Sequence, residues 1–210
     1  MTEREFRERE VAWRVFAHEF NSSRVEQRGG TEGTRSYLLS PLGATMNRVL
    51  LTGHLLGVEK AGQETPLLRT RLEDPTGQVT LTAGTYNPRA LSFLSQPHPP
   101  LEVSVIGKTH LFVSDRGQQY LSVRAETFAP LDPAEVPRRH LETSEHTLRR
   151  LTLVGALEKT PIPSREELQA EGFPTAWVDG VLEARRSYPA LDLEPYRRMV
   201  GSVLAKLDSG

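Results

Sequence analysis

The stretch LLRTRLEDPTGQVTLTAG, residues 67–84, carries the clearest structural signal in the chain. Leu68, Thr70 and Leu72 alternate with Arg69 and Arg71, the period of two that a half-buried strand requires. The DPTG sequence that follows suits a tight turn, with proline at its second position and glycine at its fourth. Alternation then resumes over residues 79–83, so the stretch predicts a β-hairpin.

The flanking sequence predicts three more strands and one short helix. Residues 49–58 are apolar and β-branched at their start, and Gly53 would let this strand bend. Asn87 and Pro88 suit the start of a helix that ends near Gln96. Two further strands are expected at residues 101–113, broken at Gly107, and at residues 120–128. The order of three strands, a helix and two strands is that of a five-stranded OB-fold barrel, expected over residues 37–130.

The segments on either side of the barrel have a different character. Residues 1–36 are expected to form an N-terminal extension, in which the polar, glycine-rich stretch 21–36 is interpreted as a flexible loop. Within the extension, residues 11–20 fit helical and strand spacing equally well. Three prolines within 130–138 predict a linker. Residues 131–210 are expected to be a helical C-terminal region, so the fold class is mainly β with α extensions.

The last predicted helix carries a narrow apolar seam with steps of three and four residues. A seam of this width packs on other helices, either on those of the same chain or on those of a partner subunit. We favour the partner subunit. The seam consists of Leu193, Tyr196, Val200, Val203 and Leu207.

Composition and motifs argue against several classes of protein. The chain has no cysteine, no membrane-span-length apolar run and no signal-like start, so we expect a cytoplasmic protein without disulfides or a membrane association. Its net charge is −1, and residues 48–124 hold 8 basic and 6 acidic side chains. No metal-binding, nucleophile or phosphate-loop motif is present. We therefore expect no enzyme activity, no metal site and no cofactor.

Several stretches resemble one known family. VAWRVFAHEFNSS (residues 11–23), YLLSPLGATMNRVLLTG (37–53), EDPTG (73–77) and AGTYNPRA (83–90) are similar to archaeal RPA-associated proteins. The resemblance implies an OB fold, single-stranded DNA as ligand, and a place beside other replication protein A subunits in DNA replication and repair. It implies no catalytic residues, and it transfers no DNA-contacting motif.

Candidate DNA contacts therefore come from physical reasoning. Single-strand binding needs cations that follow the phosphates and aromatic faces on which bases stack. Arg69 and Arg71 point away from the predicted core together, although a solvated strand face is the alternative. Phe112 and Tyr120 flank the second hairpin, where Phe112 is the more readily explained as a plug for the barrel end. The full set is Arg48, Arg69, Arg71, Tyr86, Lys108, His110, Phe112, Tyr120 and Arg124.

Two functions remain compatible with the sequence. The chain is expected to be a single-stranded DNA-binding subunit of a replication protein A-like complex. The alternative is an assembly subunit that holds a partner OB-fold protein and has little DNA affinity of its own.

Overall fold

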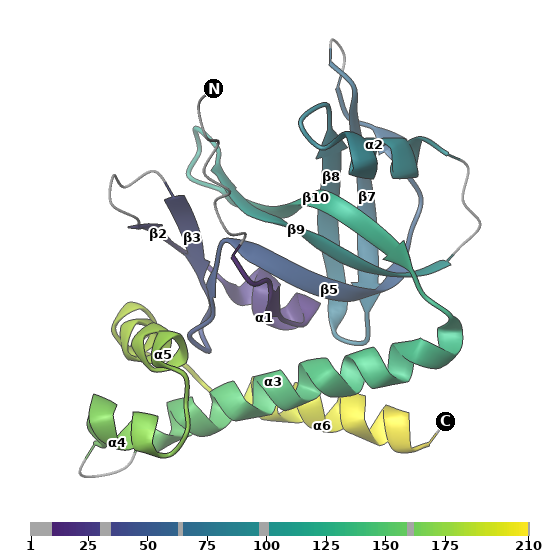
Figure 1. The fold of residues 1–210 in the computed structure, drawn as a ribbon. Coiled ribbons are helices and arrows are strands. Elements are labelled where there is room, and N and C mark those ends of the chain that lie inside the picture. Colours follow the sequence, from purple (N-terminus) through teal and green to yellow (C-terminus); the bar gives the residue numbers. More distant parts are fainter. Residues whose placement is uncertain (1–9, 30–34, 63–64, 97–100, 159–161, 210) are drawn as a thin grey trace, which may run out of the picture.

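The computed structural model describes residues 10–29, 35–62, 65–96, 101–158 and 162–209, and its centre is a closed barrel (Figure 1). The strands follow one another around the ring in the order β5–β9–β10–β8–β7, and β7 pairs again with β5. Only the β8–β10 pairing is parallel among these. The barrel elements are β5 (Arg48–Leu55), β7 (Leu67–Asp74), β8 (Gly77–Gly84), α2 (Pro88–Ser95), β9 (Leu101–Val113) and β10 (Gln119–Pro130).

This strand order, with α2 between the third and fourth strands, is that of an OB fold, so the predicted fold class is confirmed. The ring closes next to Gly53, because His54 and Leu55 at the end of β5 pair with β7 while they still pair with β9. A Cβ atom at Gly53 would lie 2.1 Å from the carbonyl oxygen of Glu73. Only glycine lets the two backbones approach so closely, which is the role that the sequence suggested for it.

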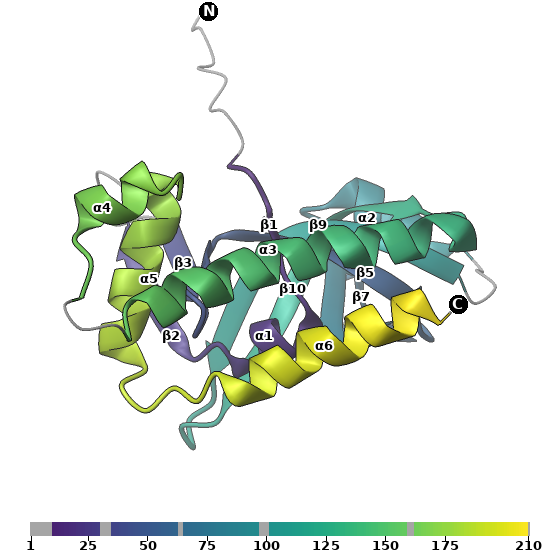
Figure 2. The ribbon, with the colours of Figure 1, turned by 90° about the horizontal axis from the view of Figure 1, so that it is seen from below.

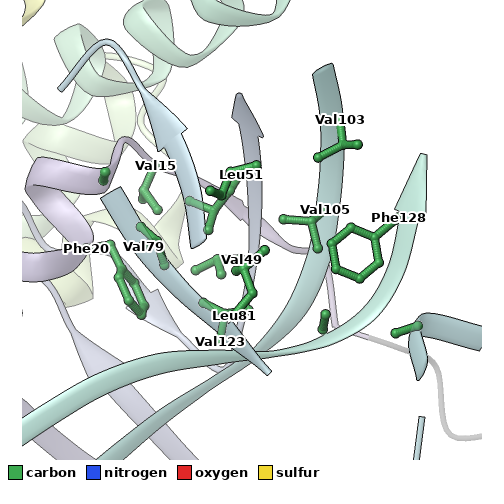
Figure 3. Close-up of a cluster of buried hydrophobic side chains, with 14 of the residues drawn as sticks. Val15, Phe20, Val49, Leu51, Val79, Leu81, Val103, Val105, Val123 and Phe128 are labelled. Carbon is green, nitrogen blue, oxygen red and sulfur yellow. The ribbon is translucent and has the colours of Figure 1, made fainter. Parts of the chain in front are cut away.

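The barrel interior is filled by the apolar residues of the alternating patterns (Figure 3). On β7 the expected alternation is confirmed, since Thr70 and Leu72 are buried while Arg69 and Arg71 are exposed. Gly107 does not break β9 as predicted. The strand continues through it. Glycine is required at this position for a different reason, because a Cβ there would lie 2.5 Å from the Arg124 carbonyl oxygen. The labelled core residues are Val15, Phe20, Val49, Leu51, Val79, Leu81, Val103, Val105, Val123 and Phe128.

The N-terminal segment, which fitted helix and strand equally well, forms one of each. β1 (Trp13–Arg14) pairs in parallel with the start of β5, and α1 (Ala17–Ser22) follows directly. The carboxylate of Asp74, at the DPTG turn, accepts a hydrogen bond of 2.6 Å from the backbone N–H of Ala17. The same carboxylate accepts from the backbone N–H and the hydroxyl of Thr76. One turn residue thus fixes both the hairpin and the start of α1.

The interpretation of residues 21–36 as a flexible loop is corrected for the residues that the structure describes. β2 (Val25–Gly29) and β3 (Arg35–Leu39) pair as antiparallel strands, and β3 also pairs with β4 (Thr45–Met46). A short strand β6 (Glu59–Lys60) pairs with β7 at the edge of the barrel sheet. The division of the chain into an extension, a barrel and a tail stays a prediction.

The C-terminal helices lie on the side of the barrel opposite α2 (Figures 1 and 2). The segment that was interpreted as a linker is compact, since Asp132 caps the 3₁₀ turn Pro133–Glu135 and α3 begins at once. Among the described residues no helix is both long and apolar enough to cross a membrane. The helices are α3 (Val136–Ala156), α4 (Arg165–Ala170), α5 (Thr175–Ser187) and α6 (Glu194–Asp208).

A buried ion pair joins the helical layer to the barrel. The Arg150 guanidinium on α3 lies 2.5 Å from the Glu19 carboxylate on α1, and both side chains are almost completely excluded from solvent. Ser40 donates a further hydrogen bond of 2.8 Å to the Glu19 carboxylate. On the other side of the layer, the Tyr188 hydroxyl donates to the Leu39 carbonyl at 2.8 Å. The helices are therefore a fixed part of the molecule.

The prediction that the apolar seam of α6 meets a partner subunit is corrected by the structure. Leu193, Tyr196, Val200 and Val203 are buried within the chain itself, where α6 packs along α3 (Figure 2). Leu207, near the helix end, is half-buried. Four of the five seam residues are therefore used in packing within the chain and have little surface left for another subunit.

Candidate functional site

A groove of about 710 Å³ is lined by residues of the β9–β10 hairpin and of the end of β8. These elements lie on the opposite side of the barrel from α3 and α6 (Figure 1), and no residue of those helices lines the groove. Six of the nine predicted DNA-contacting residues line it. These are Tyr86, Lys108, His110, Phe112, Tyr120 and Arg124.

Strand register brings the cations of the groove side by side. Lys108 on β9 is the cross-strand partner of Arg124 on β10, and Arg124 is in register with Thr82 on β8. Both cationic side chains are exposed, and neither forms an ion pair with any residue that the structure describes. Two unneutralised positive charges on adjacent strands are suited to a polyanion that crosses the barrel.

The aromatic side chains of the groove are exposed. Tyr86 is 98% exposed, Phe112 is 54% exposed and Tyr120 is 53% exposed. Phe112 and Tyr120 are cross-strand partners whose ring centroids lie 6.2 Å apart at an interplanar angle of 33°. Phe112 therefore does not plug the barrel end. Exposed rings that line a groove together with cations are platforms on which nucleic-acid bases can stack.

His110 lies between the cations and the aromatic pair. Partial burial lowers the pKa of its imidazole below the usual value, and the positive charge of Arg124 lowers this pKa further, while Glu26 acts in the opposite direction. The ring is therefore mainly neutral at neutral pH. An anion bound in the groove would favour the protonated ring and raise this pKa.

A second cavity, of about 620 Å³, continues from the first past the start of α2. Glu126, Tyr86 and Asn87 line both cavities. The backbone of residues 10–12 borders the second cavity on its far side, because Glu10 and Ala12 contribute to its wall.

Arg48 lines the second cavity, but its charge is already paired, and its role as a DNA contact stays a prediction. Its Nε atom donates a hydrogen bond of 2.9 Å to Oε2 of Glu126, and its Nη2 atom donates to the same oxygen. Arg48 is buried, and its charge is balanced by this carboxylate. The sequence could not reveal the pair, because the two residues are 78 positions apart.

Arg69 and Arg71 point outward as predicted but line neither cavity. Arg69 lies at the edge of the groove, where it is the cross-strand partner of Thr82 and forms an exposed ion pair of 3.4 Å with Glu59. Arg71 donates to the side-chain oxygen of Gln78 at 3.2 Å. Their role in DNA binding stays a prediction.

Sequence reasoning missed Glu126 as a residue of the groove. A signal for it was present, since Tyr120, Ser122 and Arg124 alternate outward and Glu126 continues the same period. A register irregularity between Ala125 and Thr127 places Glu126 at a β-bulge, which turns a side chain in a new direction.

Comparison with known proteins gives only distant similarities. No protein-family model matches the sequence, and no curated protein sequence matches it. A chain of a replication protein A heterotrimer bound to single-stranded DNA aligns with a TM-score of 0.48 and 16% identity, over 67% of this chain and 98% of that chain. The mitochondrial single-stranded DNA-binding protein Rim1 of S. cerevisiae aligns with a TM-score of 0.31 and 18% identity, over 41% and 95%. The asparaginyl-tRNA synthetase of Entamoeba histolytica aligns at 0.34 and 15%, over 55% and 31%.

Because these scores and identities are low, the assignment of the OB fold rests on the strand order and registers of the chain itself. The residues that line the groove supply the argument about function.

Proposed function

We propose that this chain binds single-stranded DNA as a subunit of a replication protein A-like complex that acts in DNA replication and repair. One observation carries the proposal: Lys108 and Arg124 gather with three exposed aromatic rings around a single groove across an OB barrel. The cations would contact phosphates, and each stacked base would contribute about 1–3 kcal/mol. In this proposal the chain has a binding role and no catalytic one.

The groove chemistry favours an unpaired strand over a duplex. Phe112, Tyr120 and Tyr86 can stack only on bases whose faces are free, and a paired, stacked duplex offers such faces only at its ends. The number of uncompensated cations is small, so the affinity of the isolated chain should be modest. Other subunits of the complex would extend the DNA track.

Fluorescence anisotropy with a short labelled oligo-dT tests this function. We expect the chain to bind the single strand more tightly than a duplex of equal length, with an affinity that falls steeply as salt increases, because binding releases counterions from the phosphates. Equal binding of both forms, or binding that does not depend on salt, would contradict the proposal.

A second candidate function is assembly. Leu141 and Leu148 on α3 are exposed and seven residues apart, so they lie on one face of the helix. Two exposed leucines at this spacing suit a helix of another subunit. If the chain binds oligo-dT only after a partner is added, the assembly role is favoured over direct DNA binding.

We predict that DNA binding strengthens as the pH falls. The free His110 side chain has a lowered pKa, and a bound phosphate would raise this pKa, so binding takes up a proton. The affinity should therefore increase as the pH falls through the pKa of the complex and level off below that of the free chain. The gain is about tenfold for each unit by which the phosphate raises the pKa.

Anisotropy titrations between about pH 8 and pH 5 measure this effect, because the histidine charge changes in that range. A His110→Gln variant should lose the pH dependence of binding and keep its affinity at high pH. If the variant shows the same pH dependence as the original chain, another group is responsible.

A further inference from the structure

A carboxylate in a groove that binds a polyanion needs an explanation. Glu126 lines both cavities beside Lys108, and its negative charge would repel a phosphate placed over it. The pairing with Arg48 accounts for only one of the two carboxylate oxygens of Glu126. Both hydrogen bonds from Arg48 converge on Oε2, and among the residues that the structure describes none bonds to Oε1.

We propose that Glu126 contacts the base of a bound strand and favours cytosine, which carries an exocyclic amine at position 4, over uracil and thymine, which carry a carbonyl there. The inference rests on the proposed single-strand binding and adds a base preference to it. A carboxylate accepts hydrogen bonds and cannot donate them when ionised, so it pairs with an amine and is repelled by a carbonyl.

The position of the carboxylate suits this task. The β-bulge between Ala125 and Thr127 sets Glu126 apart from the regular alternation of β10. Arg48 holds one carboxylate oxygen in place, and its side chain is itself buried. A base-reading group must be held rigidly to discriminate, and a buried arginine on β5 provides that support.

Position 4 of a pyrimidine decides this contact. A cytosine whose edge faces Glu126 would donate its N4 amine to the carboxylate. A uracil in the same orientation presents its O4 carbonyl to the carboxylate, so the hydrogen bond is lost. Lys108 lines the same groove and stays free to contact a phosphate.

The test compares oligo-dC with oligo-dU, two pyrimidine strands that differ in the groups at positions 4 and 3 of the base. We expect the chain to bind oligo-dC roughly tenfold more tightly, the order of discrimination that one well-formed base contact provides. In Glu126→Gln the side-chain oxygen can still accept from Arg48 while its amide donates to the groove. This variant should bring the dC:dU ratio close to one or below it.

A matched variant separates base reading from simple charge. Glu102→Gln removes the same charge from β9 outside both cavities, and it should leave the dC:dU ratio unchanged. If Glu126→Gln acted only by removing repulsion of the phosphates, it would strengthen the binding of both oligonucleotides equally and leave the dC:dU affinity ratio unchanged.

Three results would overturn the inference: equal binding of oligo-dC and oligo-dU by the original chain, a ratio retained in Glu126→Gln, or a ratio that changes equally in Glu102→Gln. The comparison of oligo-dC with oligo-dU on the original chain needs no variant, so the inference can be rejected even if Glu126→Gln fails to fold. If the original chain binds neither strand, the failure lies in the proposed function itself.

Discussion

Exchange of both Lys108 and Arg124 for glutamate is expected to weaken single-stranded DNA binding by about 100-fold or more, because each charged contact contributes roughly 1.5–3 kcal/mol. Both side chains are exposed, and neither is in an ion pair with a described residue, so the exchange should leave the fold intact. The slope of log affinity against log salt should also fall by about 1.4, since each contact to a single-strand phosphate contributes about 0.7. Anisotropy at several salt concentrations measures both quantities.

The matched control for this pair is Arg198→Glu with Lys206→Glu. It changes the charge of one arginine and one lysine in the same way, but on exposed positions of α6, on the opposite side of the barrel from the groove (Figure 1). We expect a small loss of affinity through the long-range field alone. If both double variants weaken binding equally, the groove is not the binding site.

Exchange of Arg150 for methionine is expected to lower the free energy of unfolding by about 3–5 kcal/mol. The substitution leaves the Glu19 carboxylate buried without its counter-charge, and it removes the contact between α1 and α3. It also removes a guanidinium that lies 5.9 Å from the ring centroids of Trp13 and Trp177. Because a typical domain is stable by only 5–15 kcal/mol, chemical denaturation should show an obvious shift of the midpoint.

Arg165→Met is the matched control, since Arg165 forms an ion pair of 2.7 Å with Asp179 whose side chains are about half exposed. Loss of that pair should cost less than about 1 kcal/mol. The double variant Glu19→Met with Arg150→Met should regain most of the stability, because no charge is then left buried. Similar losses of unfolding free energy in Arg150→Met and Arg165→Met would contradict the claim that the burial of the Glu19–Arg150 pair sets its contribution to stability.

Some elements of the fold could be predicted because their signals are local. Alternation on both sides of the DPTG turn placed β7 and β8, and Asn87 with Pro88 placed the start of α2. The pairing of β2 with β3 escaped prediction. In β2 the exposed face carries Glu26 and Arg28, and the other face offers only one apolar residue, Val25, beside Gln27. The stretch is therefore too short of apolar residues for its alternation to reveal a strand.

The candidate site divides in the same way. Sequence reasoning included Lys108, His110 and Arg124 among the candidate DNA contacts, and the structure brings them into one groove. Local pattern could not show that Arg48 would be neutralised there, or that Phe112 would be exposed at the end of the barrel.

The sequence by itself determined the barrel, since strand period, turn chemistry and the small size of Gly53 act over a few residues. Only the tertiary structure decided which charges remain free and which apolar seams are covered. The partners in those decisions are far apart along the chain, as for Glu19 and Arg150, which are 131 positions apart. Burial sets the energetic consequence of such a contact, and burial is a property of the assembled molecule rather than of any one segment.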